Sequence, residues 1–193
     1  MLSLAGCALA VVRADAARYL QPVRVVGVLV SFGLAVPAWF ALGPAPATIP
    51  ALAVAAVAPA LVRVDLAEHR LPNRLVVPAL AAGGAGFLLS WAVSGELPLV
   101  PLLAALIYGG VLFVLALFDG MGMGDVKLAA ALGLASPTVV VALASPLVAF
   151  LLGGMAAVLA LIRRGRGRRI AFGPFLLVGY FGALVLTAVM RPA

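Results

Sequence analysis

The chain has 193 residues, of which 66% are hydrophobic and only 10% are charged, and its net charge is +7. This composition excludes a soluble globular domain and predicts an all-α, polytopic integral membrane protein. The basic residues form short clusters between apolar runs, as membrane loops do, so the sequence predicts lipid contact and no nucleic-acid partner. A single cysteine, Cys7, excludes an internal disulfide, and a single histidine, His69, argues against a zinc site.

Residues 1–24 form a short apolar and basic segment, and whether residues 1–20 cross the membrane or lie on it stays open. Arg13, Arg18 and Arg24 predict that this side is cytoplasmic. Residues 25–193 are expected to form one membrane-embedded domain. Its apolar runs predict spans at about residues 25–42, 49–64, 75–94, 99–118, 138–162 and 170–190.

The most highly charged loop follows the second predicted span. Its arginines place it in the cytoplasm, Pro72 is expected to end a helix, and Asn73 to cap the next one. Asp65 lies where this loop begins. It is either a helix-end acid that pairs with His69 or Arg70, or a functional carboxylate.

The third predicted span contains Gly83, Gly84 and Gly86, small residues that permit close contact between helices. The turn after it, residues 94–98, contains no basic residue and is expected on the external side. The fourth span then returns to the cytoplasmic side at a glycine-rich loop, residues 119–125.

The helix after this loop is unusually short. From Val126 only about ten residues remain before Pro137, roughly 15 Å of helix, whereas the hydrocarbon core is about 30 Å thick. The next apolar run ends in the basic cluster Arg163–Arg169, which is a strong cytoplasmic signal. Residues 126–162 must therefore form a hairpin, in which the short helix goes partway in or the loop dips into the membrane.

The predicted topology has about six to seven helices, one of them short, with the N-terminus inside and the C-terminus outside. It places Asp65 and Asp125 at the same membrane face. Two neighbouring carboxylates can share a proton, so that one acts as a general base for water and the other as a general acid toward a carbonyl. This chemistry needs no metal and no other cofactor. Asp65 and Asp125 are therefore candidates for such a pair.

Gly122 and Gly124 precede Asp125, and their small size would let an extended peptide pass close to the backbone. We therefore predict that both glycines contact substrate. Lys127 is a further candidate for substrate binding, although a lysine here also serves simply as an anchor at the membrane interface. Asp125 has its own alternative as a helix-capping acid, and Asp119, in the same loop, competes with it as the partner of Asp65.

Three stretches of this sequence resemble segments of the bacterial type IV prepilin peptidases. The segment Gly122–Leu128, which reads GMGDVKL, resembles the family's GxGD motif. Asp65, followed by Arg70-Leu71-Pro72-Asn73, resembles the segment with the family's first catalytic aspartate. The segment Ala171–Phe175 is similar to the phenylalanine-glycine-proline stretch that opens the last helix of the family.

The resemblance implies a membrane-embedded aspartic endopeptidase of the bacterial inner membrane. Such an enzyme removes the short basic leader of a prepilin-like transmembrane substrate at the cytoplasmic face. By position, Asp65 and Asp125 would be its catalytic pair. Many family members also carry a cysteine-rich, zinc-binding methyltransferase domain. The chain lacks those cysteines and so resembles the short peptidase-only branch associated with Flp-type pili and related secretion systems.

Other functions stay open at this point. Archaeal preflagellin peptidases share these features, whereas presenilin-like proteases require a Pro-Ala-Leu signature near the last helices; the stretch at Pro78 lies too early. A proton- or cation-coupled transporter also uses intramembrane acids beside broken helices. The third alternative is an inactive assembly subunit of a pilus or secretion system. Oligomeric state is not predicted.

Overall fold

The computed structural model describes residues 26–118, 121–164 and 171–190, and in these residues it contains seven α-helices and no strand. The helices are α2 (Val26–Leu42), α3 (Thr48–Glu68), α4 (Asn73–Ser94), α5 (Leu99–Leu117), α6 (Met123–Leu134), α7 (Val139–Arg164) and α8 (Gly173–Met190). Their number and order confirm the predicted all-α architecture. The N-terminal segment, Asp119 and most of the basic cluster after α7 lie outside the described residues.

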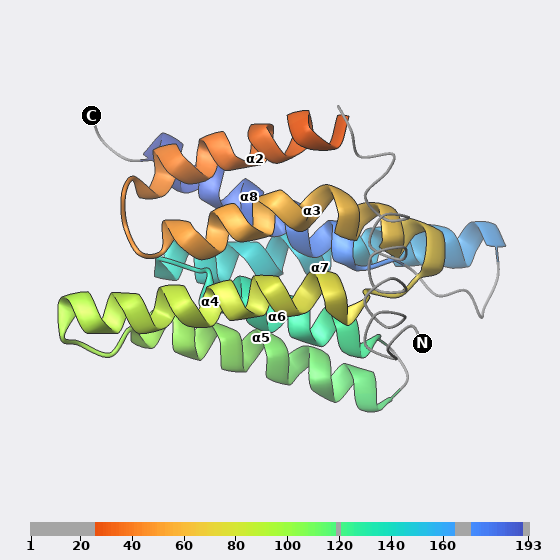
Figure 1. Cartoon of the computed structure of the whole chain (residues 1–193). Helices are drawn as coiled ribbons and strands as arrows, with labels where there is room; N and C mark the ends of the chain where they lie inside the picture. The colour runs from red at the N-terminus through yellow and green to blue at the C-terminus, as the bar shows by residue number, and fades with distance from the viewer. Residues whose placement is uncertain (1–25, 119–120, 165–170, 191–193) are drawn as a thin grey trace, which may run out of the picture.

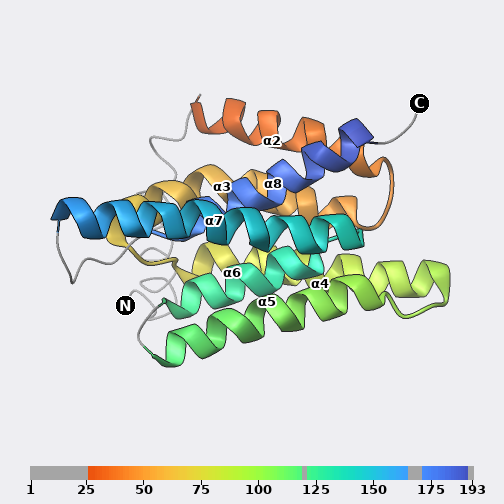
Figure 2. The same ribbon diagram turned by 180° about the vertical axis from the view of Figure 1, so that it is seen from behind.

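The helices lie side by side and alternate in direction (Figures 1 and 2). The short helix α6 packs mainly against α5 and α4, while α7 packs against α8 and α2 against α3. At one end of the bundle α3, α5 and α7 finish and α4, α6 and α8 begin. We call this the aspartate end, because Asp65 and Asp125 lie there.

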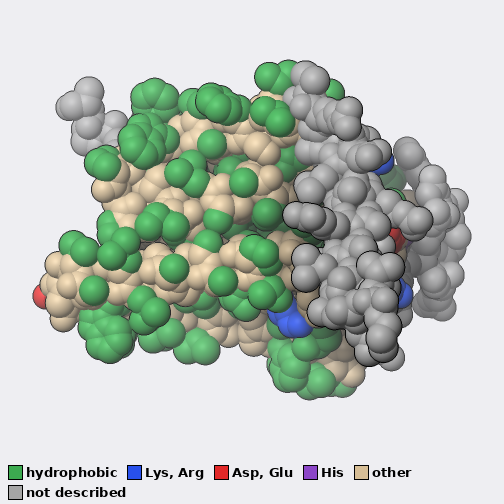
Figure 3. Space-filling view, in the orientation of Figure 1, with side chains coloured by type: hydrophobic (Ala, Val, Ile, Leu, Met, Phe, Trp, Pro, Cys, Tyr) green, Lys and Arg blue, Asp and Glu red, His purple; other side chains and the backbone are tan. Residues whose placement is uncertain are grey.

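The outer surface of the bundle is apolar. Five helices, α3, α4, α5, α7 and α8, are long and apolar enough to cross a membrane, and α2 is a shorter apolar helix. Hydrophobic side chains cover the sides of the bundle, whereas lysine and arginine side chains gather at the aspartate end (Figure 3). Because such a surface is compatible with lipid and not with water, the chain is a multi-pass membrane protein.

Helix α6 is the predicted short helix, with 12 residues and therefore a length of about 18 Å. It starts at Met123, three residues earlier than the sequence suggested, because Gly122 is extended and the helix begins directly after it. Asp125 consequently lies in the first turn of α6 and not in the loop before it.

Small residues bring α6 close to its neighbours. A Cβ atom on Gly133 would lie 2.4 Å from the backbone of Ala105 in α5, and one on Gly83 in α4 would lie 3.0 Å from the Leu134 side chain. Gly86 packs in the same way against Pro50, whereas Gly84 faces open space. The predicted role of the α4 glycines in helix packing is confirmed for Gly83 and Gly86 and is wrong for Gly84.

The boundary between α3 and α4 follows the expected chemistry with one exception. His69 closes α3 in a left-handed conformation (φ 52°), and its N–H donates to the carbonyl of Asp65 at 2.9 Å. Pro72 then separates the two helices, as predicted. The prediction that Asn73 caps α4 is wrong: Pro72 occupies the capping position, and Asn73 is the first helical residue.

Candidate active site

Asp65 lies in the last turn of α3 and is only 2% exposed. Its Oδ2 atom accepts a 2.8 Å hydrogen bond from the backbone N–H of Gly173, the first residue of α8. The first N–H groups of a helix have no partner inside the helix, and the helix dipole there favours negative charge. A helix that begins more than a hundred residues later therefore holds the Asp65 carboxylate.

Asp125 is held differently, within its own helix turn. Its Oδ2 accepts a 3.3 Å hydrogen bond from the N–H of Gly122, so the residue does help to cap α6. Its Oδ1 is buried and has no hydrogen-bond partner among the described residues. An acceptor in that state is rare in folded proteins and leaves one carboxylate oxygen available for chemistry.

Leu71 connects the surroundings of the two aspartates. A Cβ atom on Gly124, next to Asp125, would lie 2.6 Å from the Leu71 Cβ. A Cβ atom on Gly173 would lie 2.8 Å from the Asp65 Oδ2 and 3.4 Å from the Leu71 Cδ1. The buried Leu71 side chain thus touches the glycine beside each carboxylate. The fold gathers Asp65 and Asp125, which are far apart in sequence, around this residue.

The electrostatic environment links the two carboxyl groups. Asp125 lies in the first turn of the short helix α6, and therefore outside the five long helices that could cross a membrane. Burial raises the pKa of its carboxyl from an ordinary 3.8 to about 7; the charge of Asp65 also raises it, and the Gly122 N–H opposes the shift. Burial and the neighbouring charge thus favour the protonated form of Asp125, as a pair that shares one proton requires.

The start of α8 is fixed by aromatic packing. The Phe172 ring lies 5.5 Å from that of Phe150 and 6.3 Å from that of Phe175, measured between centroids. A Cβ atom on Gly153 in α7 would lie 2.4 Å from the Phe172 ring, so the ring fills the space that this glycine leaves. This packing holds the Gly173 N–H against Asp65.

Sequence reasoning predicted both aspartates as site residues but did not predict Leu71 and Gly173 as their neighbours. For Gly173 the sequence contained a signal, because Gly173 and Pro174 open an apolar helix. The N–H of Gly173 then has no partner inside the helix, and no side chain blocks the approach of a carboxylate. For Leu71 there was no such signal, because an apolar residue in a charged loop has many possible partners.

The other predicted site residues lie near Asp125. Gly122 caps the start of α6, and Gly124 directly precedes Asp125 in the first turn. The Lys127 Nζ donates a 2.8 Å hydrogen bond to the Asn73 Oδ1, which joins α6 to α4. Lys127 is therefore engaged within the protein. In the described part of the chain no three His, Cys, Asp or Glu side chains cluster as metal ligands would.

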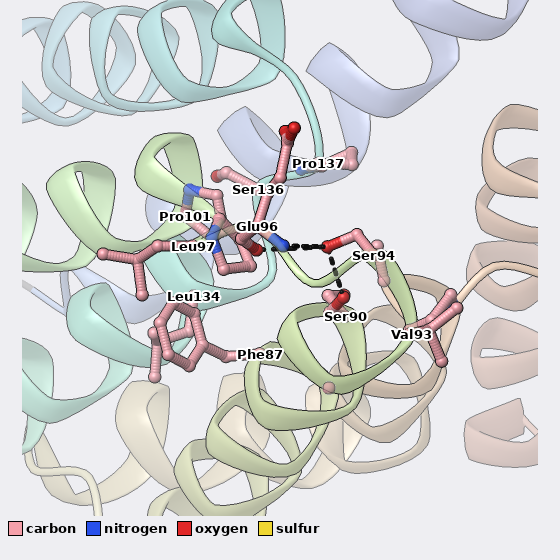
Figure 4. A pocket seen from close by; sticks show the side chains of 14 residues that line it. Phe87, Ser90, Val93, Ser94, Glu96, Leu97, Pro101, Leu134, Ser136 and Pro137 are labelled. Carbon is pink, nitrogen blue, oxygen red and sulfur yellow. Dashed lines mark hydrogen bonds between the residues drawn. The ribbon is translucent and has the colours of Figure 1, made fainter.

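A cavity of about 370 Å³ lies at the other end of α6, away from both aspartates. Residues of α4, the turn between α4 and α5, and the turn between α6 and α7 line it, among them Ser94, Glu96, Leu134 and Ser136 (Figure 4). Neither Asp65 nor Asp125 belongs to its lining, so this cavity is separate from the candidate active site.

Of the comparisons with known proteins, one gives a match. No curated protein and no solved structure matches the chain. The model of the type IV leader peptidase family matches residues 52–162, which is more than half of the chain and includes both aspartates. The chain belongs to the type IV leader peptidase family.

Proposed function

We propose that the protein is an aspartic endopeptidase of the bacterial inner membrane that cleaves the leader peptide of prepilin-like proteins at the cytoplasmic face, with Asp65 and Asp125 as its catalytic pair. One observation carries this proposal: a buried carboxylate, Asp65, and a half-buried one, Asp125, come from different helices to the same end of an apolar bundle, with a glycine beside each. Family membership supports a leader peptidase in general, and the carboxylates supply the mechanism.

In this mechanism the pair activates a water molecule. One carboxylate takes a proton from the water, whose oxygen bonds to the carbonyl carbon of the scissile amide, while the other carboxyl donates its proton to the carbonyl oxygen. Collapse of this tetrahedral species breaks the C–N bond, and a proton passes to the departing amine. The shared proton is expected on Asp125, because its Oδ1 accepts no hydrogen bond that would stabilise a negative charge, whereas Asp65 accepts one from the Gly173 N–H.

The substrate must present an extended backbone to this pair. A transmembrane helix hides its amide groups in internal hydrogen bonds, so the segment to be cut has to unwind first. Gly122 is exposed and leaves the backbone beside Asp125 free of bulk, which favours the approach of such a segment, whereas Gly124 lets Leu71 pack close to Asp125. Lys127 would lie along the same path, held by Asn73.

The basic side chains favour the cytoplasmic orientation. The described lysine and arginine side chains gather at the aspartate end, and the loop between α4 and α5 at the opposite end contains Glu96 and no basic residue. Cytoplasmic loops of membrane proteins are enriched in lysine and arginine. The carboxylate pair would then face the compartment in which the basic leader of a prepilin-like substrate lies before it is removed.

The test is cleavage of a prepilin-like protein from the same genome by the purified protein, followed by mass spectrometry of the product's N-terminus. We expect one cut that removes the leader, and loss of cleavage in Asp65→Asn and in Asp125→Asn. Full activity in both variants would contradict the proposal. Proton or cation flux in liposomes without cleavage would indicate a transporter, and neither activity would indicate an assembly subunit.

A further inference from the structure

The turn between α6 and α7 lies deep in the bundle. Since α6 is only about 18 Å long and starts at the aspartate end, this turn falls within the roughly 30 Å of the hydrocarbon core. Ala135 and Ser136 in the turn are fully buried. Backbone groups in such a place need partners inside the protein, because neither water nor lipid supplies them.

Part of this need is met locally. The N–H of Ala135 donates to the Ala131 carbonyl at 3.0 Å, the N–H of Ser136 donates to the Gly133 carbonyl at 3.0 Å, and the Ser136 Oγ donates to the Leu132 carbonyl at 3.0 Å. The carbonyl of Ala135 needs a partner from outside the turn. The hydroxyl of Tyr180 in α8, itself fully buried, donates to that carbonyl at 2.8 Å.

The start of α7 has a second carbonyl without a helical partner. In a regular helix the carbonyl of Ala142 accepts from the N–H of residue 146, but that residue is Pro146, which has no N–H. The hydroxyl of Tyr108 in α5 donates to the Ala142 carbonyl instead. It also interacts with the hydroxyls of Ser136 and Ser145. Two tyrosines from two helices thus complete the hydrogen bonding of the α6–α7 hairpin.

The turn has an open volume on one side. The cavity described above borders it, with Leu134, Ser136 and Pro137 in its lining (Figure 4). Hydrogen bonds to α8 and α5, together with the close packing of Gly133 against Ala105, therefore set the position of the turn along the bundle. At the opposite end of α6, about three turns away, lies Asp125.

We propose that Tyr108 and Tyr180 are positioning residues, which hold the far end of α6 and thereby set the position of Asp125 relative to Asp65. The inference rests on the proposed function, since it concerns the same carboxylate pair. A helix of 12 residues moves as a rigid rod, so a displacement at the turn reaches Asp125 almost undiminished. Catalytic rates respond strongly to displacements of about 1 Å.

The test combines Tyr180→Phe and Tyr108→Phe with a matched control on α8. Each phenylalanine keeps the ring and removes the hydroxyl that bonds the hairpin. Thr187→Val also removes a hydroxyl from α8, but that hydroxyl donates to the Ala183 carbonyl of its own helix at 2.9 Å. We expect kcat for leader cleavage to fall about 10- to 100-fold in each phenylalanine variant, with little change in KM, and to stay unchanged in Thr187→Val.

A second readout does not depend on activity. Spin labels at Leu66→Cys in α3 and Met123→Cys in α6, which are 59% and 52% exposed, report the separation of the two helices beside the aspartates once Cys7→Ser has removed the native thiol. We expect the distance distribution to shift or broaden in the phenylalanine variants and not in Thr187→Val. If Tyr180→Phe does not fold, Tyr108→Phe alone decides.

Two results would overturn the inference. One is a folded phenylalanine variant with the distance distribution of the unsubstituted protein, and the other is a folded phenylalanine variant with the kcat of the unsubstituted protein. Failure of the proposed function gives a different pattern. In that case the unsubstituted protein cleaves no leader, whereas the spin-label distances still report whether the two tyrosines hold α6 in place.

Discussion

Asp65 and Asp125 are the two carboxylates of one site, yet the fold holds them in opposite ways. Asp65 accepts a 2.8 Å hydrogen bond from a helix that begins more than a hundred residues later. Asp125 accepts a 3.3 Å bond from its own turn and keeps a buried oxygen atom without a partner in the described structure. One carboxylate depends on the assembled bundle, and the other depends on a local helix start.

This difference assigns different tasks to the two groups. The hydrogen bond from the start of α8 favours the charged form of Asp65 and partly offsets burial, which favours the protonated form. A buried carboxylate with a free oxygen and a charged neighbour is stabilised in its protonated form. The pair therefore has the asymmetry that general acid–base catalysis needs, and the following predictions test it from the largest expected effect to the smallest.

Replacing either carboxylate should abolish cleavage. Asp65→Asn and Asp125→Asn keep the size of the side chain and the oxygen that accepts from Gly173 or Gly122, but they remove the titrating group. We expect kcat to fall by three or more orders of magnitude in each, as is typical of catalytic groups that act as a unit. Initial rates of leader cleavage measure this, and a loss below tenfold in either variant would remove that residue from the mechanism.

The glycines beside the two carboxylates should be nearly as sensitive. Gly173→Ala would place a Cβ atom 2.8 Å from the Asp65 Oδ2, and Gly124→Ala would place one 2.6 Å from the Leu71 Cβ and backbone oxygen. We expect about 10- to 100-fold lower kcat/KM in both, because a carboxylate or its neighbour must move. Gly182→Ala is the control, since it lies in α8 with Gly173 and faces open space. Equal activity in all three variants would contradict the proposed geometry.

Asp125 should make stability depend on pH. Its pKa is raised from 3.8 to about 7 in the folded protein, so the folded state favours the protonated form. The stabilisation is therefore complete below the ordinary aspartate pKa and is lost as the pH rises through about 7. Thermal unfolding in detergent between pH 4 and 8 should show a Tm that falls with pH, and less so in Asp125→Asn. Parallel curves for the two proteins would show that Asp125 does not titrate in this range.

The smallest effect is expected at Lys127. Its hydrogen bond to Asn73 joins α6 to α4 at a solvent-accessible position, and such a bond contributes only about 1 kcal/mol. Lys127→Met should therefore raise KM by a few fold and change kcat little. Lys127 either contacts the substrate or supports α6 through its bond to Asn73, and Asn73→Ala separates these two roles. If KM stays unchanged in Asn73→Ala, the lysine contacts the substrate directly. If KM rises as much as in Lys127→Met, the lysine acts by supporting α6.

Sequence patterns that depend on neighbouring residues predicted most of this fold. Apolar run lengths predicted the five long apolar helices and the shorter α2, Pro72 marked the end of α3, and the ten residues before Pro137 identified the short helix. Features that depend on distant contacts were missed or wrong. Asn73 has the chemistry of a helix cap, but its side chain bonds Lys127 from another helix instead. The contact between Asp65 and Gly173 requires α3 and α8 to be packed together, which no local pattern encodes.

The central claim, that Asp65 and Asp125 act as one catalytic pair, is tested most directly by a double-mutant cycle on leader cleavage. Initial rates are measured for the unsubstituted protein, Asp65→Asn, Asp125→Asn and the double variant, each checked for monodispersity. The account predicts that the double variant is no slower than the slower single variant, because either substitution already disables the pair. Losses that multiply in the double variant would show that the two carboxylates act independently and would contradict the account.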